Sequence, residues 1–168
     1  MNKTTATCVA PTCVAVTCAA ATYEAATYEA YLEAHGELTY TNVGVSMLPM
    51  LKQGRDLFTL KKKTEERCRR YDVVLYRSPQ GKYVLHRVVE VREEDYVILG
   101  DNCLNKEYGI TDADILAVLT RFVRKGKEYP VTHKGYVRYA KFWYAIYPIR
   151  RLLKKCKALC RRILKGRT

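Results

Sequence analysis

Between residues 38 and 123 the chain repeats one pattern, in which a short run of β-branched, aromatic and leucine residues is followed by a polar or glycine- and proline-containing separator. Such runs are typical of β-strands. None of the separators is long enough for a crossover helix, which parallel strands would require, so consecutive strands should run antiparallel. The sequence therefore predicts a mainly β domain of about six strands in antiparallel, coiled, barrel-like sheets. The predicted strands are LTYTNVGV at 38–45, DLFTLKK at 56–62, DVVLY at 72–76, YVLHRVVEV at 83–91, YVIL at 96–99 and DILAVLTRFV at 114–123.

The N-terminal segment has a different character, because residues 6–30 form five consecutive pentapeptides with Thr at the second place of each. A period of five matches neither a helix nor a strand. The uncharged run from Thr4 to Tyr23 is mostly Ala and Thr, whereas a membrane span needs about 20 predominantly apolar residues. We therefore expect a low-complexity extension over residues 1–30, with a weak signal anchor as the alternative. Residues 24–35 favour a short helix that ends at Gly36.

Charge is segregated along the chain. Residues 129–168 hold 12 of the 30 Lys and Arg residues and none of the 17 Asp and Glu residues, and the whole chain carries a net charge of +13. We divide the chain into an extension at 1–30, a near-neutral β domain at 31–128 and a basic aromatic and helical tail at 129–168. The tail should meet an anionic partner.

The tail contains an aromatic segment at 136–147, YVRYAKFWYAIY, and then apolar residues at helical spacing. A helix with one apolar and one cationic face favours an anionic membrane surface, contacted through residues 136–167. Packing of the apolar face on the β domain is the alternative. Nucleic acid is disfavoured as a partner, since phosphate contacts would leave the apolar face uncovered. The apolar positions are Ile149, Leu152, Leu153, Cys156, Leu159, Cys160, Ile163 and Leu164.

The seven cysteines are an odd number, and none of those after residue 30 has a two-residue zinc spacing. We predict no disulfide framework, no metal and no cofactor. Reduced thiols favour a cytoplasmic location, peripheral at the inner face of the membrane, with a transmembrane or exported catalytic domain as the alternative. The sequence does not define an oligomeric state.

One serine and one histidine are candidates for catalysis. Ser46 lies in VGVSMLPML, after a predicted strand that ends at Val45, and Pro49 restricts the backbone three residues later. A nucleophilic serine needs such a fixed direction and a neighbouring base, although a turn serine fits the pattern too. His86 interrupts an apolar strand, where packing would orient its ring. Asp101, directly after a strand in LGDNC, could orient that histidine as the third member of a triad.

Taken together, VSMLPML, DVVLYRSPQGKYVLHRVVEV and VILGDN resemble the boxes of the serine peptidase clan that contains signal peptidase I and the LexA-type repressors. The resemblance covers about residues 36–125. It implies that Ser46 is the nucleophile and that His86 is the base, as in the archaeal and endoplasmic-reticulum branch. It further implies that Asp101 is the acid of the Gly-Asp-Asn box and that Asp112 matches a second acidic residue.

The resemblance implies a serine endopeptidase that cleaves a signal- or leader-like segment of a peptide or precursor protein, with the Ser46 N–H as an oxyanion donor. The chain departs from the family at Gly44, where bacterial enzymes have a second hydroxyl, and at Tyr71, where a glycine is usual. We expect residues 1–35 to supply neither the membrane span that precedes the serine in the family's peptidases nor the helix-turn-helix unit of the repressors. Two alternatives stay open: a non-catalytic membrane-surface or peptide-binding module, and a self-cleaving regulator.

Overall fold

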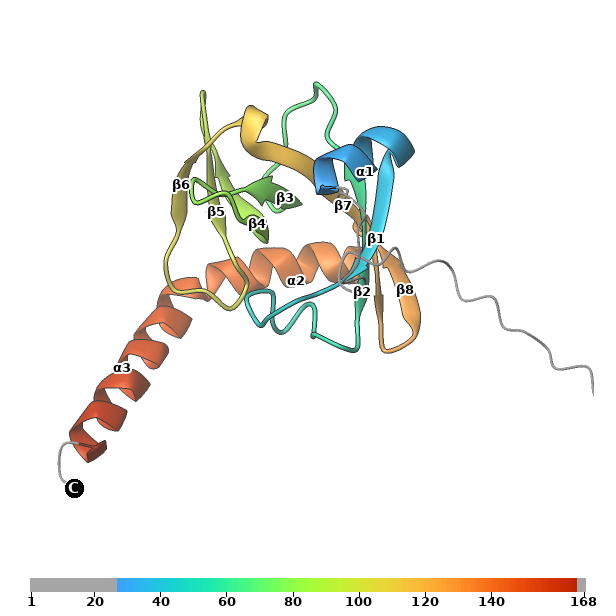
Figure 1. Ribbon diagram of the computed structural model, residues 1–168. Helices are drawn as coiled ribbons and strands as arrows, with labels where there is room; N and C mark the ends of the chain where they lie inside the picture. Colours follow the sequence, from blue (N-terminus) through green and yellow to red (C-terminus); the bar gives the residue numbers. More distant parts are fainter. Residues whose placement is uncertain (1–26, 166–168) are drawn as a thin grey trace, which may run out of the picture.

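The computed structural model describes residues 27–165 (Figure 1). Most of the pentapeptide repeat therefore lies outside the described residues. The elements are α1 (Tyr28–His35), β1 (Glu37–Thr41), β2 (Leu57–Lys62), β3 (Val73–Arg77), β4 (Tyr83–Val91), β5 (Tyr96–Leu99), β6 (Glu107–Ile110), a 3-10 turn (Asp112–Asp114), β7 (Ile115–Arg124), β8 (Lys127–Pro130), α2 (Lys134–Ala145) and α3 (Tyr147–Lys165).

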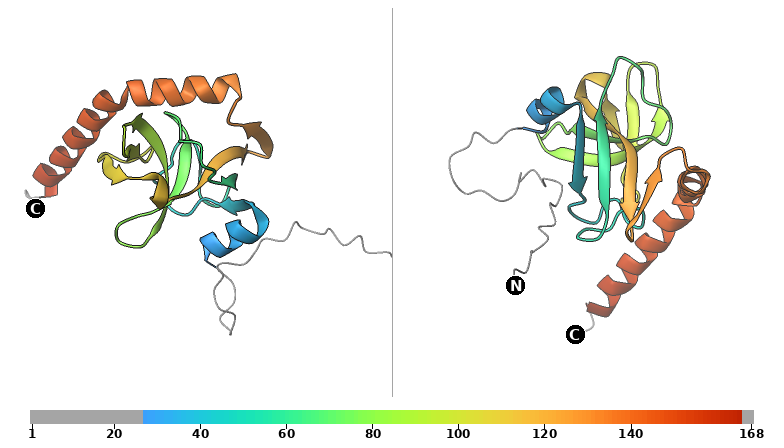
Figure 2. Two further views of the ribbon diagram at one scale, coloured as in Figure 1. Left: turned by 90° about the horizontal axis from the view of Figure 1, so that it is seen from above. Right: turned by 90° about the vertical axis from the view of Figure 1, so that its right-hand side faces the viewer.

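The strands form one antiparallel sheet in the order β1-β2-β7-β3-β4-β5-β6. Strand β8 pairs with the C-terminal end of β7. The predicted mainly β, antiparallel fold is confirmed. The sheet is strongly curled, as Figure 2 shows, but within the described residues it is open, with β1 and β6 at its ends. All six predicted strands occur, and β6 and β8 are additional.

The first strand is shorter than predicted. It ends at Thr41 rather than Val45, so Ser46 lies inside a loop between β1 and β2 and not at the strand exit. Three buried side chains, Met47, Met50 and Leu51, fix this loop in the main core. Burial of these three large apolar side chains anchors the loop to the core.

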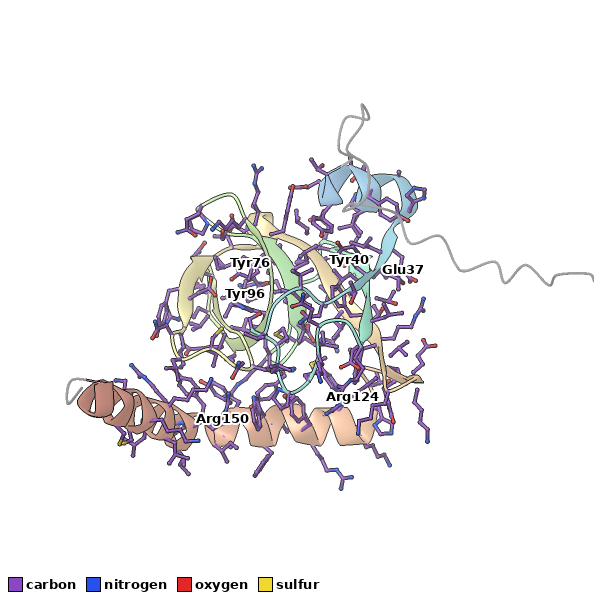
Figure 3. The ribbon with its side chains drawn as sticks, turned by 60° about the horizontal axis from the view of Figure 1, so that its bottom comes forward. Glu37, Tyr40, Tyr76, Tyr96, Arg124 and Arg150 are labelled. Atoms are coloured by element: carbon purple, nitrogen blue, oxygen red, sulfur yellow. The ribbon has the colours of Figure 1, made fainter. Side chains whose placement is uncertain are left out.

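The core has two main clusters of buried side chains. The larger lies under α1, β1, β2 and the C-terminal half of β7, and includes Leu32, Leu60 and Phe122. The smaller fills the curl of β3 to β6, where Tyr76 and Tyr96 are fully buried (Figure 3). These two rings leave polar hydroxyls inside the curl, close to the strand that carries His86.

Helix α1 confirms the predicted short helix from Tyr28 onward. Thr27 caps its N-terminus by accepting the Ala30 N–H, and Gly36 ends it with a φ of 69°. That left-handed conformation carries little penalty for glycine alone, which explains the stop. Leu32 is buried against the sheet as the spacing requires.

The tail divides into two helices with different environments. Helix α2 packs along the sheet, and its Tyr136 and Ala140 are buried, as is Tyr147 at the start of α3 (Figure 1). Part of the aromatic segment therefore packs on the domain, whereas Phe142 is 61% exposed. The boundary predicted at residue 129 also falls inside β8.

Helix α3 projects away from the sheet in every view (Figure 2). Its side chains Ile149, Leu152 and Leu153 are more than half exposed, so this part of the apolar face does not pack on the domain. No helix of residues 27–165 is long and apolar enough to cross a membrane.

Candidate active site

His86 lies in the middle of β4, where it pairs with Val74 of β3, and the residue is 6% exposed. Its Nδ1 atom is 2.8 Å from Oε1 of Glu107, at the start of β6. The Tyr76 hydroxyl donates to the other carboxylate oxygen of Glu107 at 2.5 Å. The carboxylate is therefore fixed from two sides, and it fixes the imidazole ring in turn.

The electrostatics of this pair favour a protonated ring. Burial lowers the pKa of His86, but hydrogen bonds with Cys103 and Glu107 and their charges outweigh it and raise that pKa to about 9. The hydrogen bond with His86 holds the pKa of Glu107 below its ordinary value. An imidazolium flanked by a carboxylate is the arrangement that stabilises the charged state of a histidine base.

The other ring nitrogen faces the turn after β5. Nε2 of His86 lies 3.9 Å from Sγ of Cys103. A Cβ atom at Gly100 would stand 2.7 Å from Nε2 and 2.6 Å from Sγ, closer than real contacts allow. Glycine at this position is therefore what lets the histidine and the thiol approach each other.

The same turn holds the loop that carries Ser46. The Asn102 N–H donates to the Ser46 carbonyl at 2.7 Å, and the Asn102 side-chain amide donates to the Val45 carbonyl at 3.1 Å. The structure thus places the Ser46 backbone and the His86 ring against the same turn, residues 100–103. No hydrogen bond joins their side chains, both of which are described, and the Ser46 N–H donates to no acceptor among residues 27–165.

Asp101 does not orient His86. It is 3% exposed and forms a two-pronged ion pair with Arg87, with both N–O distances 2.8 Å, and it accepts the Tyr139 hydroxyl at 2.9 Å. The reason is strand geometry: successive side chains of β4 point to opposite faces, so Arg87 faces Asp101 while His86 faces Glu107. The prediction that Asp101 orients His86 is therefore wrong, and Glu107 is the carboxylate that contacts the His86 ring.

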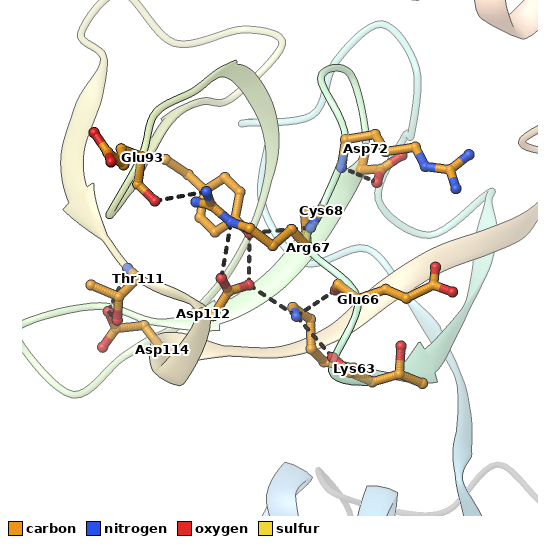
Figure 4. A network of polar contacts seen from close by, with 12 residues as sticks. Lys63, Glu66, Arg67, Cys68, Asp72, Glu93, Thr111, Asp112 and Asp114 are labelled. Carbon is orange, nitrogen blue, oxygen red and sulfur yellow. Dashed lines mark hydrogen bonds and ion pairs between the residues drawn. The ribbon is translucent and has the colours of Figure 1, made fainter.

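Asp112 is also placed elsewhere. Its carboxylate contacts Lys63 at 2.9 Å, Arg67 at 3.3 Å and the Tyr96 hydroxyl at 2.6 Å, in the network of Figure 4. None of its contacts among the described residues is with Ser46 or His86. Asp112 therefore belongs to a surface ion-pair network and does not lie beside Ser46 or His86 as the resemblance implied.

Two residues of the site, Glu107 and Cys103, were missed by sequence reasoning. Glu107 begins a short strand, EYGI, whose Gly109 and exposed Tyr108 hide the alternation of a buried face. Cys103 directly follows the Gly-Asp-Asn box, and that adjacency was the one available signal.

Among residues 27–165 no group of three or more Cys, His, Asp and Glu side chains lies close enough together to hold a metal ion.

Comparison with known proteins adds no assignment, since no family model, curated protein or solved structure matches this chain.

Proposed function

We propose that the protein is a serine endopeptidase of the signal-peptidase type, with Ser46 as nucleophile, His86 as base and Glu107 as the group that orients His86. The observation that carries the proposal is the joining of the Ser46 loop to the turn at residues 100–103, against which His86 is packed. A nucleophile and an oriented base on two rigid elements are what acyl transfer to serine requires.

Glu107 occupies Nδ1, so Nε2 is the nitrogen that accepts the Ser46 proton when the hydroxyl attacks a peptide carbonyl. Only the neutral ring can accept it, and because the pKa of His86 is raised to about 9, the active fraction and the cleavage rate should increase as the pH rises toward 9. The unengaged Ser46 N–H donates to the oxyanion, and His86 returns the proton to the leaving amine. Substrate binding must bring Oγ to about 3 Å from Nε2, a tightening that is common between free and substrate-bound states.

The substrate class in this proposal is a signal- or leader-like peptide segment, on the strength of the three sequence boxes. The Gly44 N–H is taken by the Gln53 side chain at 2.9 Å, so the position of the family's second hydroxyl supplies no oxyanion donor here. The Ser46 N–H is then the principal donor, and the rate depends strongly on it.

We also propose that α3 holds the protein on an anionic membrane surface, peripheral to the cytoplasmic face. Its exposed Ile149, Leu152 and Leu153 supply an apolar stripe, and neighbouring cations such as Lys155 and Lys157 are exposed beside it. Each cation near anionic lipid contributes on the order of 1 kcal/mol. Free thiols at Cys68 and Cys103 support a reducing compartment.

The test is cleavage of a fluorogenic leader-like peptide by the full chain in the presence of anionic vesicles. Ser46→Ala and His86→Ala should each abolish cleavage. The chain has only one other serine, Ser78, so Ser78→Ala is the matched control and should retain it. Undiminished cleavage by Ser46→Ala would overturn the proposal and leave the non-catalytic binding module as the better description.

A further inference from the structure

The contact between His86 and Cys103 has no part in the proposed peptidase reaction. Glu107 and Cys103 nevertheless contact the two nitrogens of the same His86 ring. Oε1 of Glu107 is 2.8 Å from Nδ1, and Sγ of Cys103 is 3.9 Å from Nε2. A thiol next to an imidazole that is itself held by a carboxylate is the arrangement that produces a reactive thiolate. We propose that Cys103 is such a nucleophile and is a site of reversible modification by low-molecular-weight disulfides.

The surroundings of the thiol support a stable ion pair. The thiol proton passes to Nε2, and the resulting imidazolium lies between the Cys103 thiolate and the Glu107 carboxylate, which offsets the loss of water around the ring. Cys103 is partly exposed, so a small reagent can reach it. Cys68 provides the contrast within the fold, because burial raises the pKa of its thiol to about 11 and leaves it inert.

Backbone geometry selects the kind of chemistry. The Asn102 N–H is committed to the Ser46 carbonyl, and the Cys103 N–H is committed to the Gly100 carbonyl at 2.8 Å. An acyl group on Cys103 would therefore lack these local oxyanion donors, which acyl transfer needs. Attack on a disulfide sulfur needs no such donor, only a thiolate and access.

The step is thiol–disulfide exchange. The Cys103 thiolate attacks one sulfur of the small disulfide, a bond forms between the two sulfurs, the original S–S bond breaks, and the second sulfur leaves as a thiolate that takes a proton from water or from His86. No net electron transfer to another group is required. A thiol in excess reverses the modification.

The modification has a consequence for Ser46, and this part rests on the proposed function. A mixed disulfide at Cys103 places additional atoms against Nε2, the nitrogen that the Ser46 hydroxyl must approach. Cleavage should then stop on modification and return on reduction. In Cys103→Ala, cleavage should no longer respond to the disulfide.

The primary experiment measures alkylation of Cys103 by iodoacetamide in the full-length reduced chain from pH 6 to pH 8, with the modified peptide quantified by mass spectrometry. A paired thiolate persists at low pH, so the rate at Cys103 should change less than about threefold over this range. In His86→Gln the rate should instead fall about tenfold for each pH unit, as it does for a thiol with an ordinary pKa of about 8.5.

Several outcomes decide the proposal. If the alkylation rate at Cys103 of the wild-type chain falls tenfold for each unit by which the pH is lowered, the proposal is overturned. This outcome does not depend on whether His86→Gln folds. Oxidised glutathione should then form a mixed disulfide at Cys103 and not at Cys68. Ser46→Ala should give the same Cys103 profile, so failure of the peptidase proposal and failure of this one are separately visible. The exposed Cys156 serves as the control that the reagent is active.

Discussion

The reassignment of Asp101 leads to a specific prediction about stability. Arg87 is 1% exposed, and its charge is neutralised by Asp101, while its other contacts are neutral: the Tyr71 carbonyl, the Tyr136 hydroxyl and the Met50 sulfur. Asp101→Asn keeps the size of the side chain but leaves the buried guanidinium without its ion-pair partner.

The magnitude follows from the burial of both partners. Removing one member of a buried ion pair costs about 3–5 kcal/mol. At about 1.4 kcal/mol for each factor of ten, the folding equilibrium constant should fall by roughly two to three orders of magnitude. For a domain of this size the melting temperature should fall by about 10 °C or more.

The assay is urea unfolding, followed by far-UV circular dichroism and by fluorescence of Trp143, the only tryptophan of the chain. Its indole N–H donates to the Asp101 carbonyl at 2.8 Å, so the probe lies at the perturbed position. The matched control is Asp112→Asn, whose side chain is 41% exposed and whose ion pairs should contribute at most about 1 kcal/mol. Equal stability of the two variants, or a loss below about 1 kcal/mol in Asp101→Asn, would refute the structural role.

Two further predictions concern the histidine and the tail. The pKa of His86 rises from 6.5 to about 9 on folding, so its contribution, on the order of 3 kcal/mol, should be fully present below pH 6.5 and lost as the pH rises through 9. Glu107→Gln should lower that pKa and destabilise the protein at pH 6 more than at pH 9.5, as measured by urea midpoints; an equal loss at both pH values would contradict the pairing. Leu152→Asp should reduce binding to anionic vesicles at least about tenfold in a sedimentation assay, since burying a leucine contributes about 1.5–3 kcal/mol. Val91→Asp, at an exposed position on β4, should not reduce binding, and equal binding by the two variants would rule out the α3 surface as the anchor.

The strands were predictable because their composition and their short separators are local properties. Gly36 ended α1 as expected, since the left-handed stop depends on one residue. The strand end at Val45 was wrong because β-branched residues also occur in loops, and burial of Met47 and Met50, a tertiary effect, decides the path of this segment. Likewise, the aromatic residues of 136–147 give no local sign of whether a sheet or a lipid surface covers them, and here the sheet covers Tyr136.

The site was only partly predictable for a related reason. Ser46 and His86 stood out from their neighbours in the sequence, whereas the partner of His86 depends on which face of β4 each residue occupies. In the sequence, Asp101 and Glu107 both follow the strand at 96–99, and no local feature shows which of the two carboxylates contacts His86. Only the pairing of β4 with β5, and of β5 with β6, assigns Arg87 to the first carboxylate and His86 to the second.

The central claim is that Ser46 has an activated hydroxyl, and covalent labelling with a fluorophosphonate probe tests it most directly. The full-length chain should gain one label, which peptide mapping should locate at Ser46. Ser46→Ala and His86→Ala should remain unlabelled, while Ser78→Ala should be labelled as the wild type is. Absence of labelling in the folded wild-type protein, or labelling that persists in Ser46→Ala, would contradict the account.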